Sequence, residues 1–406
     1  MSGALAGIRV VEVALWSFVP SAGVALAEWG AEVIKVEAPE GGDKLRGLVV
    51  SGVPAGEGGL SFMFEVNNRG KRSVGIDVRN PEGRDLVLRL AERSDVFLTS
   101  LLPEVRARLG LDIDDLRGGN PHLVYAIGSA GGLLGAEAGL GGYDLASYWA
   151  RTGLGLAATA PCADVPANMP VAGFGDMSSG LVLAAGVAAA LVGRERTGEG
   201  AVVDVSLLGT GLWAAQTEVT ATNLLGVDRF FKREREEATN PINAAYRTKD
   251  GRFVQLVMLE ADRHWPDLCA RVGRDDLAAD QRFATMADRR ANAPACIAAL
   301  DEIFATRTAD EWCDALAGAS GVWTLVRTAR EAAEDPQGRA NGYVRTATSA
   351  AGAPYVSVST PVRFDGTEAS VGPAPEHGAD TDAVLEDVLG IDTERLIELK
   401  VSGAVL

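Results

Sequence analysis

The segments Ile8-Arg-Val-Val-Glu-Val13 and Ala31-Glu-Val-Ile-Lys-Val36 decide the fold of this chain of 406 residues. Each reads as a short strand, and residues 21–29 between them read as a helix that Gly30 ends. A strand, a helix and a second strand in this order form a βαβ unit. We therefore expect an α/β fold with a parallel, doubly wound sheet.

The turn after the first strand, Ala14-Leu-Trp-Ser-Phe-Val-Pro20, contains no GxGxxG motif. Rossmann domains that bind dinucleotides hold the pyrophosphate on that glycine-rich turn. The missing motif argues against NAD or FAD as a ligand despite the topology.

Alternating strands and helices continue along the chain. We expect strands at 74–78, 95–100, 123–129 and 201–205, and helices at 81–93, 103–109, 143–153 and 207–225. A charged linker, 228–237, ends this first part. Beyond it we expect a hairpin over 244–258 with Asp250-Gly251 at its turn, a helical region over 261–318, strand-like patterning over 322–364, and two helices at 379–389 and 393–400.

Composition narrows the classes of partner. The formal net charge of -17 argues against nucleic acid or an anionic membrane as the main partner. The N-terminus shows no signal-peptide pattern, and the apolar run 181–192 is shorter than the ~20 residues of a membrane span. We expect a cytoplasmic protein in which that run is a central core helix.

The histidines and cysteines predict no metal site. The 3 His residues lie far apart in the sequence, and the 4 Cys residues show no CxxC spacing. Neither a zinc site nor a Ser-His-Asp triad is expected from this pattern.

Asp176 stands in Val171-Ala-Gly-Phe-Gly-Asp-Met-Ser-Ser-Gly180, ahead of the apolar run. Two interpretations stay open from these residues alone. Asp176 is either the N-cap of the following helix, a position that Asp favours, or a reactive carboxylate facing a cleft. In the second case the helix start favours the ionised form, and the glycines let a ligand approach closely.

A second polar stretch, Asn67-Asn-Arg-Gly-Lys-Arg-Ser73, runs against the acidic trend of the chain. Four donor-rich side chains fall within five positions: Asn68, Arg69, Lys71 and Arg72. They form either a solvated loop or a site for a phosphate-bearing ligand.

These motifs together resemble the family III CoA-transferases, which include formyl-CoA transferase, carnitine and bile-acid CoA-transferases, and α-methylacyl-CoA racemase. The resemblance runs over nearly the whole chain, and the order and spacing of its motifs are specific. The matching stretches are Gly30-Ala-Glu-Val-Ile-Lys-Val-Glu37, Asn68-Arg-Gly-Lys-Arg-Ser73, Gly142-Tyr-Asp144, Gly175-Asp176, Arg196-Thr-Gly-Glu-Gly200, Val203-Asp-Val-Ser206, Thr248-Lys-Asp-Gly251, Asp280-Gln-Arg-Phe283 and Glu376-His377.

The resemblance implies a large Rossmann-like domain built from both chain ends and a smaller middle domain. We expect residues 1–226 in the large domain, 227–325 in the small domain with its linkers, and 326–406 returning to the large domain. It also implies a homodimer of two interlocked chains. Coenzyme A would be bound as part of the acyl-CoA substrate, without a metal or redox cofactor.

The resemblance assigns the catalytic carboxylate to Asp176. That carboxylate would attack an acyl-CoA thioester and form first a mixed anhydride and then an aspartyl-CoA thioester. Residues implied in CoA binding are Arg46, Asn68, Arg69, Lys71, Arg72, Ser100, Leu101, Arg108, Tyr143 and Asp144.

Three departures from the family pattern put the acyl substrate in doubt. Thr99-Ser-Leu-Leu102 replaces a common Glu-Asn-Phe-Arg, the helix after Gly142-Tyr-Asp144 is one residue longer, and the turn 15–20 is bulkier. The residues that would line an apolar acyl site, or would simply be core, are Trp16, Phe18, Tyr148 and Trp149, with Gly175 beside them.

Two activities remain as alternatives. The first is transfer of CoA from an acyl-CoA to a free carboxylic acid. The second is the α-methylacyl-CoA racemase reaction or another acyl-CoA isomerisation, which needs two groups that move a proton at the α-carbon. The racemases have a His where this chain has Tyr143, and a phenol with a pKa near ~10 is a poor base at neutral pH. The sequence therefore favours transfer.

Overall fold

The computed structural model describes residues 3–48, 60–230, 235–366 and 372–406. Contacts within the chain divide it into two compact units. The first comprises Met1–Ala158, Pro166–Asp228 and Pro336–Leu406, and the second Thr159–Val165 and Arg229–Asp335. Each unit is described by itself below. The linker expected at 228–237 lies partly outside the described residues.

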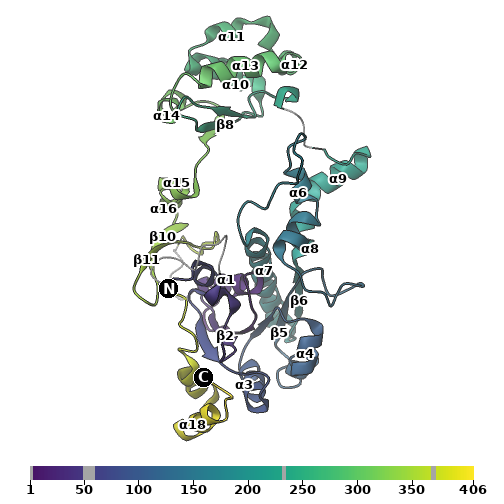
Figure 1. Ribbon diagram of the computed structural model, residues 1–406, viewed down its shortest axis with the longest axis vertical. Coiled ribbons are helices and arrows are strands. Elements are labelled where there is room, and N and C mark those ends of the chain that lie inside the picture. Colours follow the sequence, from purple (N-terminus) through teal and green to yellow (C-terminus); the bar gives the residue numbers. More distant parts are fainter. Residues whose placement is uncertain (1–2, 49–59, 231–234, 367–371) are drawn as a thin grey trace. The chain divides into compact units, whose positions relative to one another are not determined.

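The first unit is built on a six-stranded sheet with the order β3-β2-β1-β4-β5-β6, in which all neighbouring strands are parallel (Figure 1). The strands are β1 (Arg9–Val13), β2 (Glu32–Glu37), β3 (Arg72–Gly75), β4 (Val96–Thr99), β5 (Val124–Ser129) and β6 (Val202–Ser206). This confirms the α/β prediction. From β1 the chain adds β2 and β3 on one side, and then crosses back to add β4, β5 and β6 on the other side of β1. The direction in which strands are added therefore reverses between β1 and β4.

Helices cover both faces of the sheet. Neighbouring residues of a strand point to opposite faces, so each strand contributes to two separate cores. Val11 of β1 belongs to a core with α3 (Pro81–Glu92), α5 (Ile113–Arg117), α17 (Thr381–Leu389) and α18 (Thr393–Val401). Val10 belongs to the opposite core, with α1 (Phe18–Glu28) and α7 (Phe174–Thr197). The sheet is therefore doubly wound, as the βαβ unit predicts.

The end of the chain completes this unit beside β3. The Leu406 amide donates to the Gly75 carbonyl at 3.0 Å, and Val405 pairs with Ile76 in an isolated bridge. A Cβ on Gly75 would lie 2.5 Å from the Leu406 Cβ. Because Gly75 has no side chain, the side chain of Leu406 can pack against it.

Helix α7 has 24 residues and contains the apolar run that precedes the basic stretch. It packs tightly on α1, since a Cβ on Gly180 would lie 1.8 Å from the Ser21 hydroxyl oxygen. Its other side is open in the single chain, where Val182 is 45% and Val192 54% exposed. The expectation of a central core helix is therefore only partly confirmed: Leu183, Ala184, Val187 and Leu191 belong to the core with α1, whereas the opposite side of α7 is exposed. By length and composition alone α7 could cross a membrane, a test that the core helix of a soluble protein also passes.

The smaller elements of the first unit correct two further expectations. The helix predicted over 207–225 is two helices, α8 (Leu207–Ala214) and α9 (Gln216–Leu225). The helix predicted over 143–153 contains the π-helix η3 (Leu145–Ala150), and α6 (Leu154–Ala157) follows Gly153. The remaining elements are η1 (Lys44–Gly47), α2 (Phe62–Asn68), α4 (Pro103–Leu109), α16 (Pro336–Ala340), β10 (Val344–Thr348) and β11 (Pro354–Val358).

The second unit combines a three-stranded antiparallel sheet with a helical layer. The predicted hairpin is formed by β7 (Ala245–Arg247) and β8 (Phe253–Val257), with Gly251 at φ 80° in its turn, and β9 (Val322–Leu325) pairs with β8. The helices are η4 (Arg235–Glu237), α10 (Ala261–Val272), α11 (Asp275–Ala279), η5 (Gln281–Phe283), α12 (Met286–Ala291), α13 (Ala293–Phe304), α14 (Ala309–Leu316) and α15 (Ala329–Ala333). Because α15 and α16 are helical, the strand pattern expected over 322–364 is only partly correct.

Candidate active site

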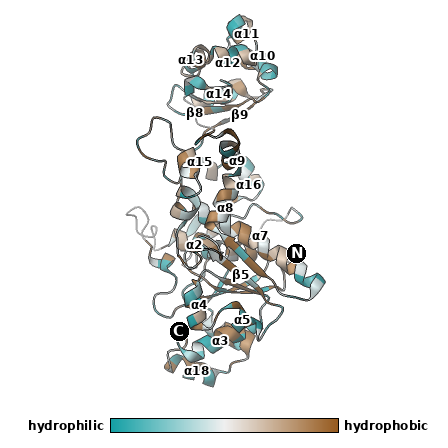
Figure 2. Ribbon diagram, turned by 90° about the vertical axis from the view of Figure 1, so that its right-hand side faces the viewer, coloured by the Kyte–Doolittle hydropathy of each residue, from teal (hydrophilic) through white to brown (hydrophobic). Residues whose placement is uncertain are grey.

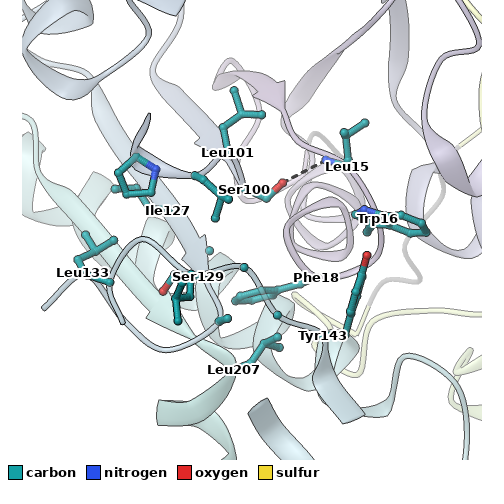
Figure 3. Close-up of a pocket in the computed structure, with 18 of the residues that line it drawn as sticks. Leu15, Trp16, Phe18, Ser100, Leu101, Ile127, Ser129, Leu133, Tyr143 and Leu207 are labelled. Atoms are coloured by element: carbon teal, nitrogen blue, oxygen red, sulfur yellow. Dashed lines mark hydrogen bonds between the residues drawn. The ribbon is translucent and has the colours of Figure 1, made fainter. Parts of the chain in front are cut away.

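A cavity of about 410 Å³ lies in the first unit at the carboxyl ends of β1, β4 and β5 (Figure 3). This is where the strand order reverses, and loops diverge there in opposite directions. Trp16 enters the cavity from the turn after β1, Phe18 from the start of α1, Ser100 and Leu101 from the loop after β4, and Ser129 from the end of β5. Sheets of this kind bind their ligands at this position.

Asp176 lines the same cavity from the first turn of α7. The N-cap of α7 is Gly173, which adopts φ 76°, so Asp176 is the third residue of the helix and not its cap. Within the described residues the Asp176 carboxylate has no hydrogen-bond or ion-pair partner. The partly buried side chain is therefore available to a ligand.

A second carboxylate, that of Asp144, holds the start of α7. Its Oδ2 accepts a hydrogen bond from the Gly175 amide at 3.3 Å, and its Oδ1 accepts one from the Leu145 amide at 2.8 Å. A Cβ on Gly175 would lie 2.6 Å from the Tyr148 ring and 2.9 Å from the Asp144 Cβ. Only glycine permits this approach, which brings the two carboxylates into one site.

The surroundings of Asp176 raise its pKa to about 7. Burial of the carboxyl group is the larger cause, and the negative charge of Asp144 adds to it. The N-terminal end of α7 acts in the opposite direction, because the helix dipole favours an anion there. Burial and like charge win, so protonated and ionised forms of Asp176 coexist near neutral pH.

The turn after β1 is strained and is held at two points. Trp16 adopts φ 67°, a left-handed conformation that bulky residues rarely take. On one side the Lys35 Nζ donates to the Ala14 carbonyl at 3.0 Å, and on the other the Leu15 amide donates to the Ser100 hydroxyl oxygen at 3.1 Å. The Trp16 ring meets the Tyr143 ring edge to face, with centroids 5.8 Å apart (Figure 3).

The predicted phosphate-binding stretch has partners inside the chain. The Lys71 Nζ contacts Glu12 at 2.7 Å and Asn68 at 3.0 Å, and both residues are buried. Arg69 pairs with Glu28 at 2.8 Å. Arg72 pairs with Glu32 and lies near Asp380 and Asp387. These contacts, and the burial of Asn68, Arg69 and Lys71, contradict the solvated loop, and the phosphate-binding role of the stretch stays a prediction.

Two other predicted CoA contacts, Arg46 and Arg108, differ in whether their charge is paired within the described chain. Arg46 forms a two-pronged ion pair with Glu37, at 2.8 and 2.7 Å, and its guanidinium lies 3.7 Å from the centroid of the Phe64 ring. Arg108 is exposed on α4 and makes no hydrogen bond or ion pair within the described residues. Of the predicted basic contacts, Arg108 is thus the one whose charge is unpaired in the described chain.

The predicted acyl-site residues separate into two groups. Trp16 and Phe18 line the cavity, as does Tyr143, which was predicted as a CoA contact. Tyr148 is buried, packs on Gly175 and does not line it. Trp149 points elsewhere, donating its indole N–H to the Ala167 carbonyl at 2.8 Å.

Several cavity residues were not expected from the sequence. Leu15, Leu133, Leu140 and Leu207 make most of the wall apolar, and Arg106 contributes its only basic side chain among the described residues. Leu15 and the loop after β4 follow the carboxyl ends of predicted strands, and that position indicates a ligand site in a parallel sheet. No sequence pattern pointed to the loop 133–140. Among the described residues no group of three or more His, Cys, Asp or Glu side chains could hold a metal ion.

Comparison with known proteins identifies the class. The model of CoA-transferase family III matches residues 5–381. The chain belongs to this family and is an enzyme of the CoA-transferase type.

Individual relatives agree over nearly full length. A protein named (R)-2-hydroxy-4-methylpentanoate CoA-transferase, from Clostridioides difficile, is 30% identical and covers 99% of both chains. The probable fatty acyl-CoA transferase Rv3272 of Mycobacterium tuberculosis is 35% identical and covers 94% of this chain and 97% of its own. A crystal structure of a CaiB/BaiF family protein from Brucella suis superposes with a TM-score of 0.82 at 27% identity, covering 96% of this chain and 100% of that chain.

Proposed function

We propose that this protein moves CoA from an acyl-CoA thioester to a free carboxylic acid through covalent intermediates on Asp176. The observation that carries the proposal is a carboxylate without a partner among the described residues, on a cavity wall at the switch point of the sheet. A carboxylate can act as the nucleophile in such a reaction, and covalent catalysis divides one difficult exchange into easier steps.

The proposed steps balance without a net proton. An Asp176 oxygen attacks the thioester carbonyl carbon, the C–S bond breaks, and CoA thiolate leaves a mixed anhydride behind. The thiolate attacks the Asp176 carbonyl carbon and releases the first acid as a carboxylate, giving an aspartyl-CoA thioester. The acceptor carboxylate attacks that thioester, and the expelled thiolate then attacks the acceptor carbonyl of the new anhydride. This releases the new acyl-CoA and restores Asp176.

The racemase alternative has less support. It needs two groups that exchange a proton with the α-carbon. Tyr143 stands where the racemases have His, and the relatives compared above are named as transferases. We therefore keep transfer as the proposed reaction.

Three expectations belong to the proposal. CoA would lie with its phosphates toward the exposed Arg108 and its thioester at Asp176, past Ser100 and Leu101. The active form would be a homodimer with interlocked chains. No metal or redox cofactor would take part in the steps above.

The proposal is tested with Asp176→Asn, which removes the nucleophile and keeps the shape of the side chain. We expect CoA transfer to fall by at least about 10³-fold while the folded chain persists. The measurement is release of CoA from an acyl-CoA in the presence of a panel of carboxylic acids. Incubation of the unaltered enzyme with acyl-CoA and hydroxylamine should convert Asp176 to its hydroxamate, detected by peptide mass spectrometry.

Asp114→Asn is the matched control. Asp114 also lies in the first turn of a helix, α5, but it is exposed and is not part of the cavity wall. Its variant should transfer CoA at nearly the normal rate. Full activity of Asp176→Asn would refute the covalent route.

A further inference from the structure

The cavity that Asp176 lines has an apolar wall with three aromatic residues. Trp16, Phe18 and Tyr143 meet there, and Leu207 closes it from the start of α8 (Figure 3). Trp16 is 37% and Tyr143 63% exposed, so both rings present apolar surface to whatever enters. An apolar group packed on these rings would gain the free energy of burying that surface.

Among the described residues, the same wall offers no unengaged cation to a second carboxylate. Arg106 is the only basic side chain lining the cavity in the described part of the chain, and it is already engaged. Its Nε lies 3.2 Å from Asp112, and its Nη1 donates to the Leu101 carbonyl at 2.7 Å. The remaining charge is that of Asp176, with Asp144 behind it. A carboxylate on the acyl chain would therefore meet like charge in a partly desolvated space, which is unfavourable.

The conformation of Trp16 gives an independent reason to assign the ring a role. Residues held in left-handed backbone conformations cost free energy and gather at functional sites. Here the strained turn is fixed by Lys35 on one side and Ser100 on the other. The result is a bulky ring placed against Tyr143, in the cavity that the proposed nucleophile also lines, on a turn that does not require a bulky residue for its own geometry.

We infer that the acyl group handled at Asp176 is apolar and uncharged beyond its thioester carbon, and that Trp16 selects it by packing against it. This rests on the proposed function, because it assumes that acyl-CoA reacts at Asp176. Dicarboxylic acyl groups are poor substrates, since their second carboxylate would have to displace that packing without a cation in return.

The experiment compares 3-phenylpropanoyl-CoA with succinyl-CoA as donors in the presence of hydroxylamine. The readout is the rate at which Asp176 becomes its hydroxamate at low donor concentration, which requires no knowledge of the acceptor acid. The unaltered enzyme should react with 3-phenylpropanoyl-CoA at least about tenfold faster. In Trp16→Gly the ratio of the two rates should fall by about tenfold or more. Glycine adopts the left-handed backbone without strain, so this variant removes the ring and keeps the turn.

Trp16→Phe is the matched variant, because it keeps an aromatic ring at the same position. It should retain most of the preference, and circular dichroism shows whether each variant is folded. Equal rates with the two donors in the unaltered enzyme, or an unchanged ratio in folded Trp16→Gly, would overturn the inference. If neither donor modifies Asp176 in the unaltered enzyme, the proposed function itself fails. If Trp16→Gly does not fold, Trp16→Asn removes the ring instead, because Asn also tolerates a left-handed backbone, and an unchanged ratio in that variant would overturn the inference.

Discussion

At the scale of single residues, two opposing influences set the pKa of Asp176: its position in the helix and its surroundings. Its place in the first turn of α7 favours the charged form, as for any acid at a helix start. Burial and the neighbouring Asp144 favour the neutral form and prevail, raising the pKa to about 7. The nucleophile is the ionised form, so the proposed activity should rise as the pH increases through about 7.

The same pKa predicts how stability depends on pH. Because the folded chain holds the Asp176 proton more tightly than the unfolded chain, it loses stability as the pH rises from the unfolded pKa of about 4 to about 7. Above that range the loss is constant. Asp176→Asn has no such proton and does not lose stability in this way. The free energy of unfolding of the variant, relative to that of the unaltered protein, should therefore rise over this interval by roughly 1–3 kcal/mol. Thermal unfolding at several pH values measures this, and a constant difference between the two proteins would contradict it.

At the scale of elements, the contact between α1 and the sheet depends on a buried group of charges. Lys35 and Lys71 both pair with Glu12, at 3.0 and 2.7 Å, and Lys35 also pairs with Asp43 at 2.8 Å. All four side chains are fully buried. Burial alone would lower the pKa of Lys35, but the facing carboxylates raise it. Lys71 also donates to the Pro20 carbonyl of α1 at 2.8 Å, and Lys35 donates to the Ala14 carbonyl, so this group connects α1 and the sheet to the turn that presents Trp16.

Gly23→Ala in α1 tests how closely this helix packs against the buried charges of Glu12 and Lys71. In an exposed helix this change would stabilise by about 1 kcal/mol. Here the new Cβ would lie 2.0 Å from the Glu12 Oε2 and 2.9 Å from the Lys71 Cε, so we expect a net loss of roughly 1–3 kcal/mol. The measurement is urea unfolding.

Gly193→Ala in α7 is the matched control for this measurement. A Cβ there would meet no described atom within 4 Å, so the helix propensity of Ala should stabilise the chain. Equal effects of the two substitutions would refute the proposed packing around Glu12.

At the scale of the whole molecule, the first unit leaves much apolar surface uncovered on three consecutive helices. Trp213 of α8 is 71% exposed, and Leu224 and Leu225 of α9 are 80% and 59% exposed. Val182 and Val192 extend this surface onto α7. Figure 2 shows the hydrophobic colouring of α7 and α8. Apolar surface gathered in this way is typical of an interface between proteins. This supports the predicted homodimer.

Trp213→Asp should weaken association of the chains, because large aromatic residues contribute most to interface stability. We expect a dimer for the unaltered protein and a rise of about 100-fold or more in the dissociation constant for the variant. Light scattering coupled to size-exclusion chromatography measures the mass.

Val401→Glu is the control for this prediction. Val401 is 84% exposed on α18, away from the surface of α7, α8 and α9, and its substitution should leave the mass unchanged. A monomeric unaltered protein would contradict the prediction of a dimer.

The sequence by itself determined the parallel sheet, because Val- and Ile-rich strands separated by a helix admit few other arrangements. The helix that follows Asp176, the hairpin turn at Asp250 and Gly251, and the two closing helices are likewise local patterns. Family membership followed from the order of motifs, each of which is short and readable without coordinates.

Only the tertiary structure decided which charged residues are free and which are paired. Lys71 and Arg69 look in the sequence like phosphate ligands, whereas their carboxylate partners, Glu12 and Glu28, are far away along the chain. The neighbourhood of Asp144 and Asp176, which raises the pKa of Asp176, also joins residues from separate elements, the start of η3 and the first turn of α7. The apolar wall that faces Asp176 was equally hidden, because Trp16, Tyr143 and Leu207 meet only where the carboxyl ends of the strands converge. Pairing, burial and cavity shape depend on distances through space, and no local pattern in the sequence specifies them.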